Sequence, residues 1–262
     1  MPSNLIKFWR DCRTDSKLLA HPEDLGTLRR SGAILPESIP QDFESFIAVS
    51  RFDDWRMHLR LLPQPYGGDL RKAEIFILLL NPGLGYTDYW GESRMESFRK
   101  RLESNLRQDL EGIEFPFLWL DPELCWHGGF VWWEKKLREV INVIARERFN
   151  GRYIDALRDV SKKLASLELL PYHSFSFGAH RLIDELPSVK VIREFVRGKL
   201  VQEAKSGKKT LIVTRQQNAW NLPTREKNII IYTGGHTRGA SLGTNSEGGK
   251  AILRHYGIVY TD

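Results

Sequence analysis

Hydrophobic residues gather in four short runs along the chain. These runs occupy residues 75–80, 167–170, 210–213 and 229–232. Each run is continuous rather than alternating with polar residues, which is typical of strands buried on both faces of a parallel sheet. The pattern therefore predicts a four-stranded parallel sheet.

Between these runs, apolar residues recur at helical spacing. Residues 95–110 and 132–146 predict two helices between the first and second strands. Residues 181–205 predict a crossover helix before the third strand, and residues 247–255 predict a short closing helix. Such alternation of strands and helices is typical of an α/β fold, here with three α-β-α layers.

Length and composition indicate a folded globular protein. The chain has 262 residues, of which 41% are hydrophobic and 27% are charged, and it contains no internal repeat. We therefore expect one domain over residues 1–262. Residues 1–70, which are charged and in places aromatic, are expected to form a helical N-terminal extension packed on that domain.

The chain carries a surplus of basic residues. Its 39 Lys and Arg against 33 Asp and Glu give a formal net charge of +6. Such a surplus favours a polyanionic partner, which is either nucleic acid or an acidic membrane face. Many basic proteins bind neither, so the charge alone leaves the partner open.

Cysteines are few, and long apolar segments are missing. Cys12 and Cys125 are too few for a disulfide framework, and no Cys-x-x-Cys pair is present to begin a metal site. The longest apolar run, residues 75–80, is far shorter than the ~20 residues that a membrane helix needs. Early charges interrupt any signal-peptide core. We expect a cytoplasmic monomer without a metal, cofactor or membrane partner.

Polar and aromatic residues follow the first two predicted strands, at the edge where parallel α/β sheets bind ligands. Asn81, Pro82 and Gly83 are turn formers, but at a strand end they also bring backbone N–H groups close to a ligand. The aromatic residues and His173 could equally be core residues. The candidate substrate-binding residues are Pro82, Gly83, Tyr86, Tyr89, Trp90, Tyr172, His173 and Ser174.

The last two predicted strands lead into polar and glycine-rich segments. Glycines within residues 234–245 would let the backbone approach a phosphate, with the side chains of His236, Arg238 and Ser241 as donors. Residues 243–250 carry one glycine too many for a P-loop, and Ala251 replaces its hydroxyl residue, so an ATPase is excluded. The candidate DNA-binding residues are Arg215, Thr237, Arg238, Ser241 and Asn245.

Two of these segments carry a resemblance to a known family. Residues 78–83 (LLLNPG) and 236–242 (HTRGASL) follow the first and last predicted strands. In this arrangement the chain resembles the uracil-DNA glycosylase superfamily, and its Asn-Pro-Gly is similar to the first motif of the mismatch-specific uracil and thymine glycosylases. Thr237 and Arg238 depart from the proline and serine usual in the second motif. The chain also lacks the cysteines of the iron-sulfur branches.

The resemblance implies a fold, a reaction and two catalytic residues. The fold would be uracil-DNA glycosylase-like, and the reaction would be hydrolysis of the N-glycosidic bond of a base flipped out of DNA, leaving an abasic site. Asn81 would position the attacking water, and His236 would stabilise the departing base. Tyr86, Tyr89 or Trp90 would stack on the extruded base. No cofactor is needed.

The base to be removed is a separate question. Bacterial proteins that resemble this chain include glycosylases of modified phage bases, which implies a defence role. The tryptophans between the first two strands either pack a core or widen the pocket for a bulky modified pyrimidine, such as a glucosylated hydroxymethylcytosine. These tryptophans are Trp119, Trp126, Trp132 and Trp133.

Two other functions remain open at this point. An asparagine in place of a carboxylate permits a DNA or modified-base reader without catalysis. A hydrolase of free nucleosides or nucleotides would need neither a DNA strand nor the basic surplus. The glycosylase hypothesis requires that Asn81 and the His236 segment meet in one cleft at the same edge of the sheet.

Overall fold

A computed structural model describes residues 3–33, 42–48, 55–215, 217–222, 226–233 and 239–259. The chain divides into two compact units, each built from three segments. Unit 1 comprises Met1–Tyr66, Leu80–Asp109 and Glu168–Phe195. Unit 2 comprises Gly67–Leu79, Leu110–Leu167 and Val196–Asp262. The single-domain interpretation stays a prediction.

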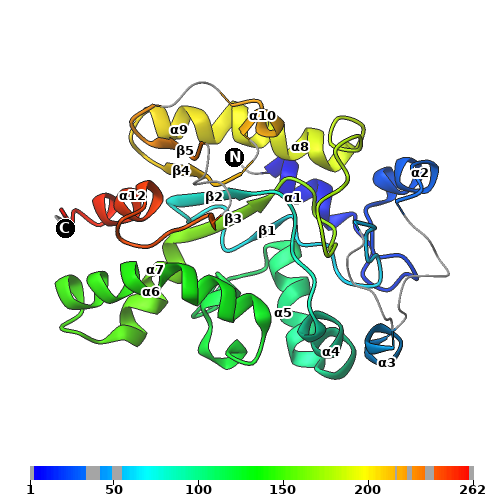
Figure 1. Cartoon of the computed structure of the whole chain (residues 1–262), viewed down its shortest axis with the longest axis horizontal. Helices are drawn as coiled ribbons and strands as arrows, with labels where there is room; N and C mark the ends of the chain where they lie inside the picture. The colour runs from blue at the N-terminus through cyan, green and yellow to red at the C-terminus, as the bar shows by residue number, and fades with distance from the viewer. Residues whose placement is uncertain are drawn as a thin grey trace. The chain divides into compact units, whose positions relative to one another are not determined.

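A five-stranded, mostly parallel sheet lies mainly in unit 2 (Figure 1). β2 pairs in parallel with β4, with Ile75 opposite Thr210, and β4 pairs in parallel with β5, with Leu211 opposite Ile229. The strand order is β1-β3-β2-β4-β5. The strands are β1 (Tyr66–Gly67), β2 (Ile75–Leu79), β3 (Leu164–Glu168), β4 (Thr210–Val213) and β5 (Ile229–Ile231).

The α/β class is confirmed, but the expectation of four strands is wrong. Every residue of β2, β3, β4 and β5 is buried. Burial on both faces explains why β2, β4 and β5 are largely continuous apolar runs, whereas β3 also buries Ser166 and Glu168. The additional strand, β1, has only two residues. A segment of that length is too short to produce a periodic pattern in the sequence.

The second strand begins and ends earlier than its apolar run. The run was expected at residues 167–170, whereas β3 spans Leu164–Glu168. Leu169 and Leu170 are buried beyond the strand end, and the backbone N–H of Leu170 donates to the carbonyl of Leu80 at 2.7 Å. Burial therefore continues past the ladder, and hydrophobicity alone does not show where the strand ends.

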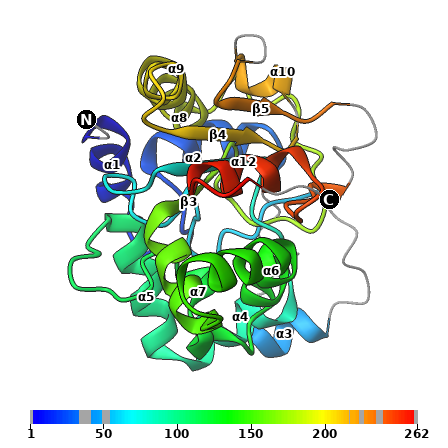
Figure 2. The same ribbon diagram turned by 90° about the vertical axis from the view of Figure 1, so that its left-hand side faces the viewer.

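The helices of unit 2 include both expected and additional elements. α6 and α7 pack side by side, and α9 and α12 both contact β4 and β5 (Figures 1 and 2). α12 has the bounds expected from the sequence, and its N-cap Ser246 accepts a hydrogen bond from the N–H of Gly249 at 2.9 Å. The α-helices are α6 (Gly128–Arg148), α7 (Tyr153–Lys163), α9 (Val201–Lys205), α10 (Gln217–Trp220) and α12 (Glu247–His255), with short 3₁₀ turns η1 (Leu118–Leu120) and η2 (Pro122–Leu124).

Unit 1 is helical. α1 contacts α5 and α8, and α4 contacts α3 and α5. Of the helix expected over residues 181–205, residues 187–205 are helical, where α8, a π-helical turn η3 (Val196–Leu200) and α9 follow one another without a break. The helices of unit 1 are α1 (Ser3–Arg10), α2 (Pro22–Arg30), α3 (Phe43–Ile47), α4 (Tyr86–Arg94), α5 (Glu96–Arg107) and α8 (Pro187–Phe195). Among the described residues, no helix is long and apolar enough to cross a membrane.

Candidate functional site

The candidate site is a turn in unit 1, residues 81–85, which we call the Asn81 turn. It follows the end of β2 at Leu79 after one further residue and leads directly into α4. Gly85 is the N-cap of α4, and its backbone N–H donates to Oδ2 of Asp88 at 2.7 Å. The turn is short, because Tyr86 already begins α4.

The carboxamide of Asn81 has a defined orientation. Its Nδ2 atom lies 3.0 Å from the carbonyl oxygen of Pro82 and 3.0 Å from Oγ of Ser174. A carbonyl oxygen can only accept, so the atom beside Pro82 must be the donor nitrogen. The Ser174 hydroxyl donates to the carbonyl of Ser176 at 2.9 Å and therefore accepts from Asn81.

This arrangement leaves the oxygen of the carboxamide available. Asn81 is half-buried, and among the described residues its Oδ1 atom has no hydrogen-bond partner. A carboxamide oxygen accepts a hydrogen bond from water or from an N–H group, but it does not take up a proton at neutral pH. Asn81 can therefore position a water molecule or recognise a donor, and it cannot act as a general base.

His173 holds the same turn from a second direction. Its Nδ1 atom lies 2.6 Å from the carbonyl oxygen of Gly83, so Nδ1 carries the proton and donates. The backbone N–H of His58 donates to the carbonyl of His173 at 2.9 Å. In the neutral ring, Nε2 is then an acceptor. It is buried and has no partner within the described part of the chain, a state that costs about 1–3 kcal/mol unless a bound group supplies a donor.

The aromatic candidates on α4 fall into two classes. Tyr89 is 2% exposed, stacks on Phe46 with ring centroids 4.5 Å apart, and has its hydroxyl 3.0 Å from Nδ1 of His58. Burial raises the pKa of Tyr89. Tyr86 and Trp90 are 55% and 38% exposed, and their i, i+4 spacing places them on one side of the helix. Tyr86 and Trp90 therefore offer ring surface to a ligand, whereas Tyr89 is packed in the core.

Comparisons of the chain with protein-family models, with curated proteins and with solved structures found no match. Among the described residues, no group of three or more His, Cys, Asp and Glu side chains could hold a metal ion.

Tyr172 is a packed residue in unit 1. Its side chain is 1% exposed, its hydroxyl donates to Oδ2 of Asp24 at 2.6 Å, and it accepts from the backbone N–H of His21 at 3.2 Å. Burial, followed by the charge of Asp24, raises the pKa of Tyr172 well above its usual value. Because the hydroxyl is used inside the protein, Tyr172 anchors the segment that carries His173 and Ser174.

The candidates after the last two strands belong to unit 2. His236, Thr237 and Arg238 lie outside the described residues, so their expected meeting with Asn81 stays a prediction. Ser241 and Asn245 are exposed. The Ser241 carbonyl accepts from the hydroxyl of Tyr232, which also accepts from the backbone N–H of Gly248 at 3.1 Å. Arg215 follows β4 and is exposed.

The tryptophans of the insert differ in burial. Trp119 and Trp133 are 7% and 5% exposed, so core packing is confirmed for these two. A Cβ atom on Gly129 would lie 2.6 Å from the Trp119 ring, which shows why this position is a glycine. Trp126 is partly buried, and Trp132 is exposed.

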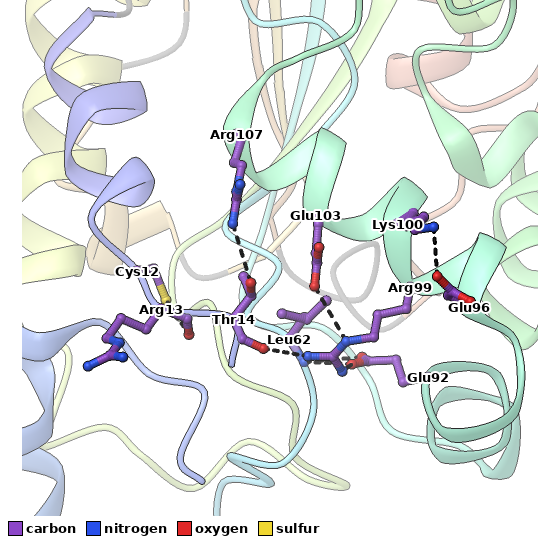
Figure 3. Close-up of polar contacts among 10 residues, drawn as sticks. All are labelled: Cys12, Arg13, Thr14, Leu62, Glu92, Glu96, Arg99, Lys100, Glu103 and Arg107. Carbon is purple, nitrogen blue, oxygen red and sulfur yellow. Dashed lines mark hydrogen bonds and ion pairs between the residues drawn. The ribbon is translucent and has the colours of Figure 1, made fainter. Parts of the chain in front are cut away.

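One buried carboxylate was not found by sequence reasoning. Both side-chain oxygens of Glu92 on α4 accept from the backbone N–H of Leu62, at 3.1 and 3.0 Å, and Oε2 lies 3.3 Å from the Arg99 guanidinium (Figure 3). Arg99 also donates to the carbonyl of Thr14 at 2.6 Å and pairs with Glu103 at 3.4 Å. Burial raises the pKa of Glu92 to about 8, against the opposing effects of Leu62 and Arg99. Its neighbours in sequence are mostly polar, so no apolar pattern marks this position.

Proposed function

We propose that the chain is a DNA glycosylase that hydrolyses the N-glycosidic bond of a modified pyrimidine and leaves an abasic site. The observation that carries the proposal is the fixed carboxamide of Asn81, whose nitrogen is held by Pro82 and Ser174 while its oxygen is left to accept. The turn begins one residue after the end of β2, a buried strand of a mostly parallel sheet, and such folds bind ligands beyond their strand ends.

The reaction needs a positioned water molecule and stabilised charge. Water adds to C1′ of the deoxyribose, the bond from C1′ to the base nitrogen breaks, and the base departs with the bonding electrons before it is protonated. Asn81 Oδ1 accepts a hydrogen bond from this water and orients it. Asn81 cannot take the proton that the attacking water loses, so the water is a weak nucleophile and the bond breaks only if the negative charge on the departing base is stabilised. We assign that role to His236.

The base must leave the duplex before it can be cut. Flipping costs a few kcal/mol, and stacking on aromatic side chains offsets part of this cost at ~1–3 kcal/mol per contact. Tyr86 and Trp90 are the exposed aromatic side chains on α4, and we assign them this role. His173 and Ser174 hold the turn against which the base would lie.

The preferred substrate is a bulky modified pyrimidine, glucosylated hydroxymethylcytosine, removed from phage DNA as a defence. A Cβ atom built on Gly83 meets nothing within 4 Å, so the turn has open space beside it. The net charge of +6 favours a DNA partner. We assign contacts with the adjacent phosphates to Arg215, Thr237, Arg238, Ser241 and Asn245.

An abasic-site assay tests the proposal. Duplexes containing uracil, mismatched thymine, hydroxymethylcytosine or glucosylated hydroxymethylcytosine are incubated with the protein, and an abasic-site endonuclease reveals the cuts. We expect cutting of the glucosylated duplex and a loss on the order of 100-fold in Asn81→Ala. Asn142→Ala makes the same chemical change on the exposed side of α6 and is expected to keep the wild-type rate.

Other outcomes select other functions. Tight binding of a modified duplex without any abasic site would identify a base reader and overturn the catalytic proposal. Release of bases from mononucleotides but not from duplexes would identify a nucleotide hydrolase. Equal rates for Asn81→Ala and Asn142→Ala would remove Asn81 from the mechanism.

A further inference from the structure

The N-terminal half of α6 presents apolar and basic side chains together at its surface. Val131 and Trp132 are 54% and 38% exposed, and Lys135 is exposed. Lys136 stands four residues after Trp132, so the two side chains lie on one side of the helix. We call these four residues the α6 face.

Neighbouring residues hold Trp132 and Lys136 in place. The Trp132 ring makes an edge contact with the buried Trp133, with centroids 4.9 Å apart and planes at 85°. The Lys136 ammonium lies 5.4 Å from the Trp132 ring centroid and donates to the carbonyl of Gly239. This hydrogen bond joins the α6 face to the segment after β5.

Among the residues that the structure describes, the positive charge on this face has no acidic partner. Burial, followed by the charges of Arg215 and Lys135, lowers the pKa of Lys136. Within the described part of the chain, neither Lys135 nor Lys136 forms an ion pair with a carboxylate. Lys136 uses one donor on Gly239 and has two further N–H donors, because an ammonium group carries three. Cations in this arrangement are matched by phosphate oxygens.

We propose that the α6 face, together with Arg215, binds an unpaired segment of a DNA strand. The two lysines and Arg215 contact successive phosphates, and the exposed indole of Trp132 stacks on a base. Such a contact requires a base whose face is not already stacked on an adjacent base. A single strand therefore fits better than an intact duplex. The inference rests on the proposed function only in taking DNA as the partner.

Equilibrium binding tests the surface without base excision. The probe is a fluorescein-labelled 12-nucleotide DNA strand of ordinary bases, alone or as a duplex, followed by anisotropy over a salt series. We expect Trp132→Leu to weaken single-strand binding about 10-fold and duplex binding less. Lys136→Gln should reduce the slope of log K against log salt by about 0.7.

Lys162→Gln provides the matched control. Lys162 is exposed on α7 of the same unit and undergoes the same change of charge, so binding and slope are expected to stay at their wild-type values. Circular dichroism checks that each variant is folded. Wild-type single-strand affinity in both Trp132→Leu and Lys136→Gln would overturn the proposal.

Two further readouts separate the alternatives. If the two variants lose binding to phosphatidylserine vesicles but keep DNA binding, the α6 face is a membrane surface and the proposal is wrong. If no duplex is cut in the abasic-site assay while single-strand binding depends on Trp132 and Lys136, the glycosylase proposal fails and the DNA-binding surface stands.

Discussion

At the scale of single residues, Asn81 matters because a carboxamide donates from one atom and accepts at the other. Its donor atom faces the Pro82 carbonyl and a Ser174 hydroxyl whose hydrogen is already directed to Ser176. Both neighbours therefore act as acceptors. An aspartate at position 81 would place an oxygen beside two acceptor oxygens, which disfavours the ionised carboxylate.

From this geometry we expect that Asn81→Asp does not create a better enzyme. Replacing a water-positioning amide by a carboxylate would supply a general base if the carboxylate could ionise in place. The two oxygens beside position 81 accept hydrogen bonds, so they favour a side chain that donates. We therefore expect Asn81→Asp to form abasic sites on the preferred duplex more slowly than the wild-type protein at pH 7. Asn142→Asp is the control for the added charge. A rate above wild type that rises with pH would show that the carboxylate is accommodated.

Among the elements, α4 carries the exposed aromatic pair and is held from its buried side by Glu92. Leu62 donates to both carboxylate oxygens, and Arg99 on α5 lies beside one of them. Burial raises the pKa of Glu92 to about 8 in the folded protein from an ordinary value of 4.5. The folded state therefore binds a proton that the unfolded chain releases over this pH window.

The sign of this linkage gives a testable result for Glu92. The stabilising effect of the protonated carboxyl is fully present below pH 4.5 and is lost as pH rises towards 8, with a limiting slope of about 1.4 kcal/mol per pH unit. We expect the free energy of unfolding, measured in urea, to decrease between pH 4.5 and 8 in the wild-type protein. In Glu92→Gln, which has no carboxyl group at this position, the decrease should be smaller. Glu96→Gln, at an exposed residue paired with Lys100, is the control. Parallel curves for wild type and Glu92→Gln would contradict the linkage.

For the whole molecule, the chain alternates between the two units. Each unit consists of three separate segments, and the chain passes back and forth between them. No single stretch of sequence contains either unit. Neither unit can therefore be made as a continuous fragment of the chain.

We therefore expect a single cooperative unfolding transition. Urea unfolding followed by tryptophan fluorescence and by far-ultraviolet circular dichroism should give coincident curves, because the segments of each unit are joined along the chain only through the other unit. Coincidence would agree with the single-domain prediction. Two separated transitions would show that the units unfold independently and would make that prediction wrong.

The sequence by itself determined the class of fold and the place of the candidate turn. Strand β4 and helix α12 have the expected bounds, because a continuous apolar run and a capped amphipathic segment are local signals. The position of Asn81 directly after a buried strand could be read in the same way. The π-helical turn after α8 could not, because apolar spacing predicts a helix but does not show a local change in its hydrogen-bond pattern.

Only the tertiary structure decided which side chains meet. Ser174, which orients Asn81, is 93 residues away in sequence, and Leu62, which contacts Glu92, is 30 residues away. Trp132 and Trp133 are adjacent, yet one is exposed and the other is buried. Local patterns carry the period of a helix or strand, whereas a hydrogen bond between distant residues depends on how the elements pack, which no local pattern records.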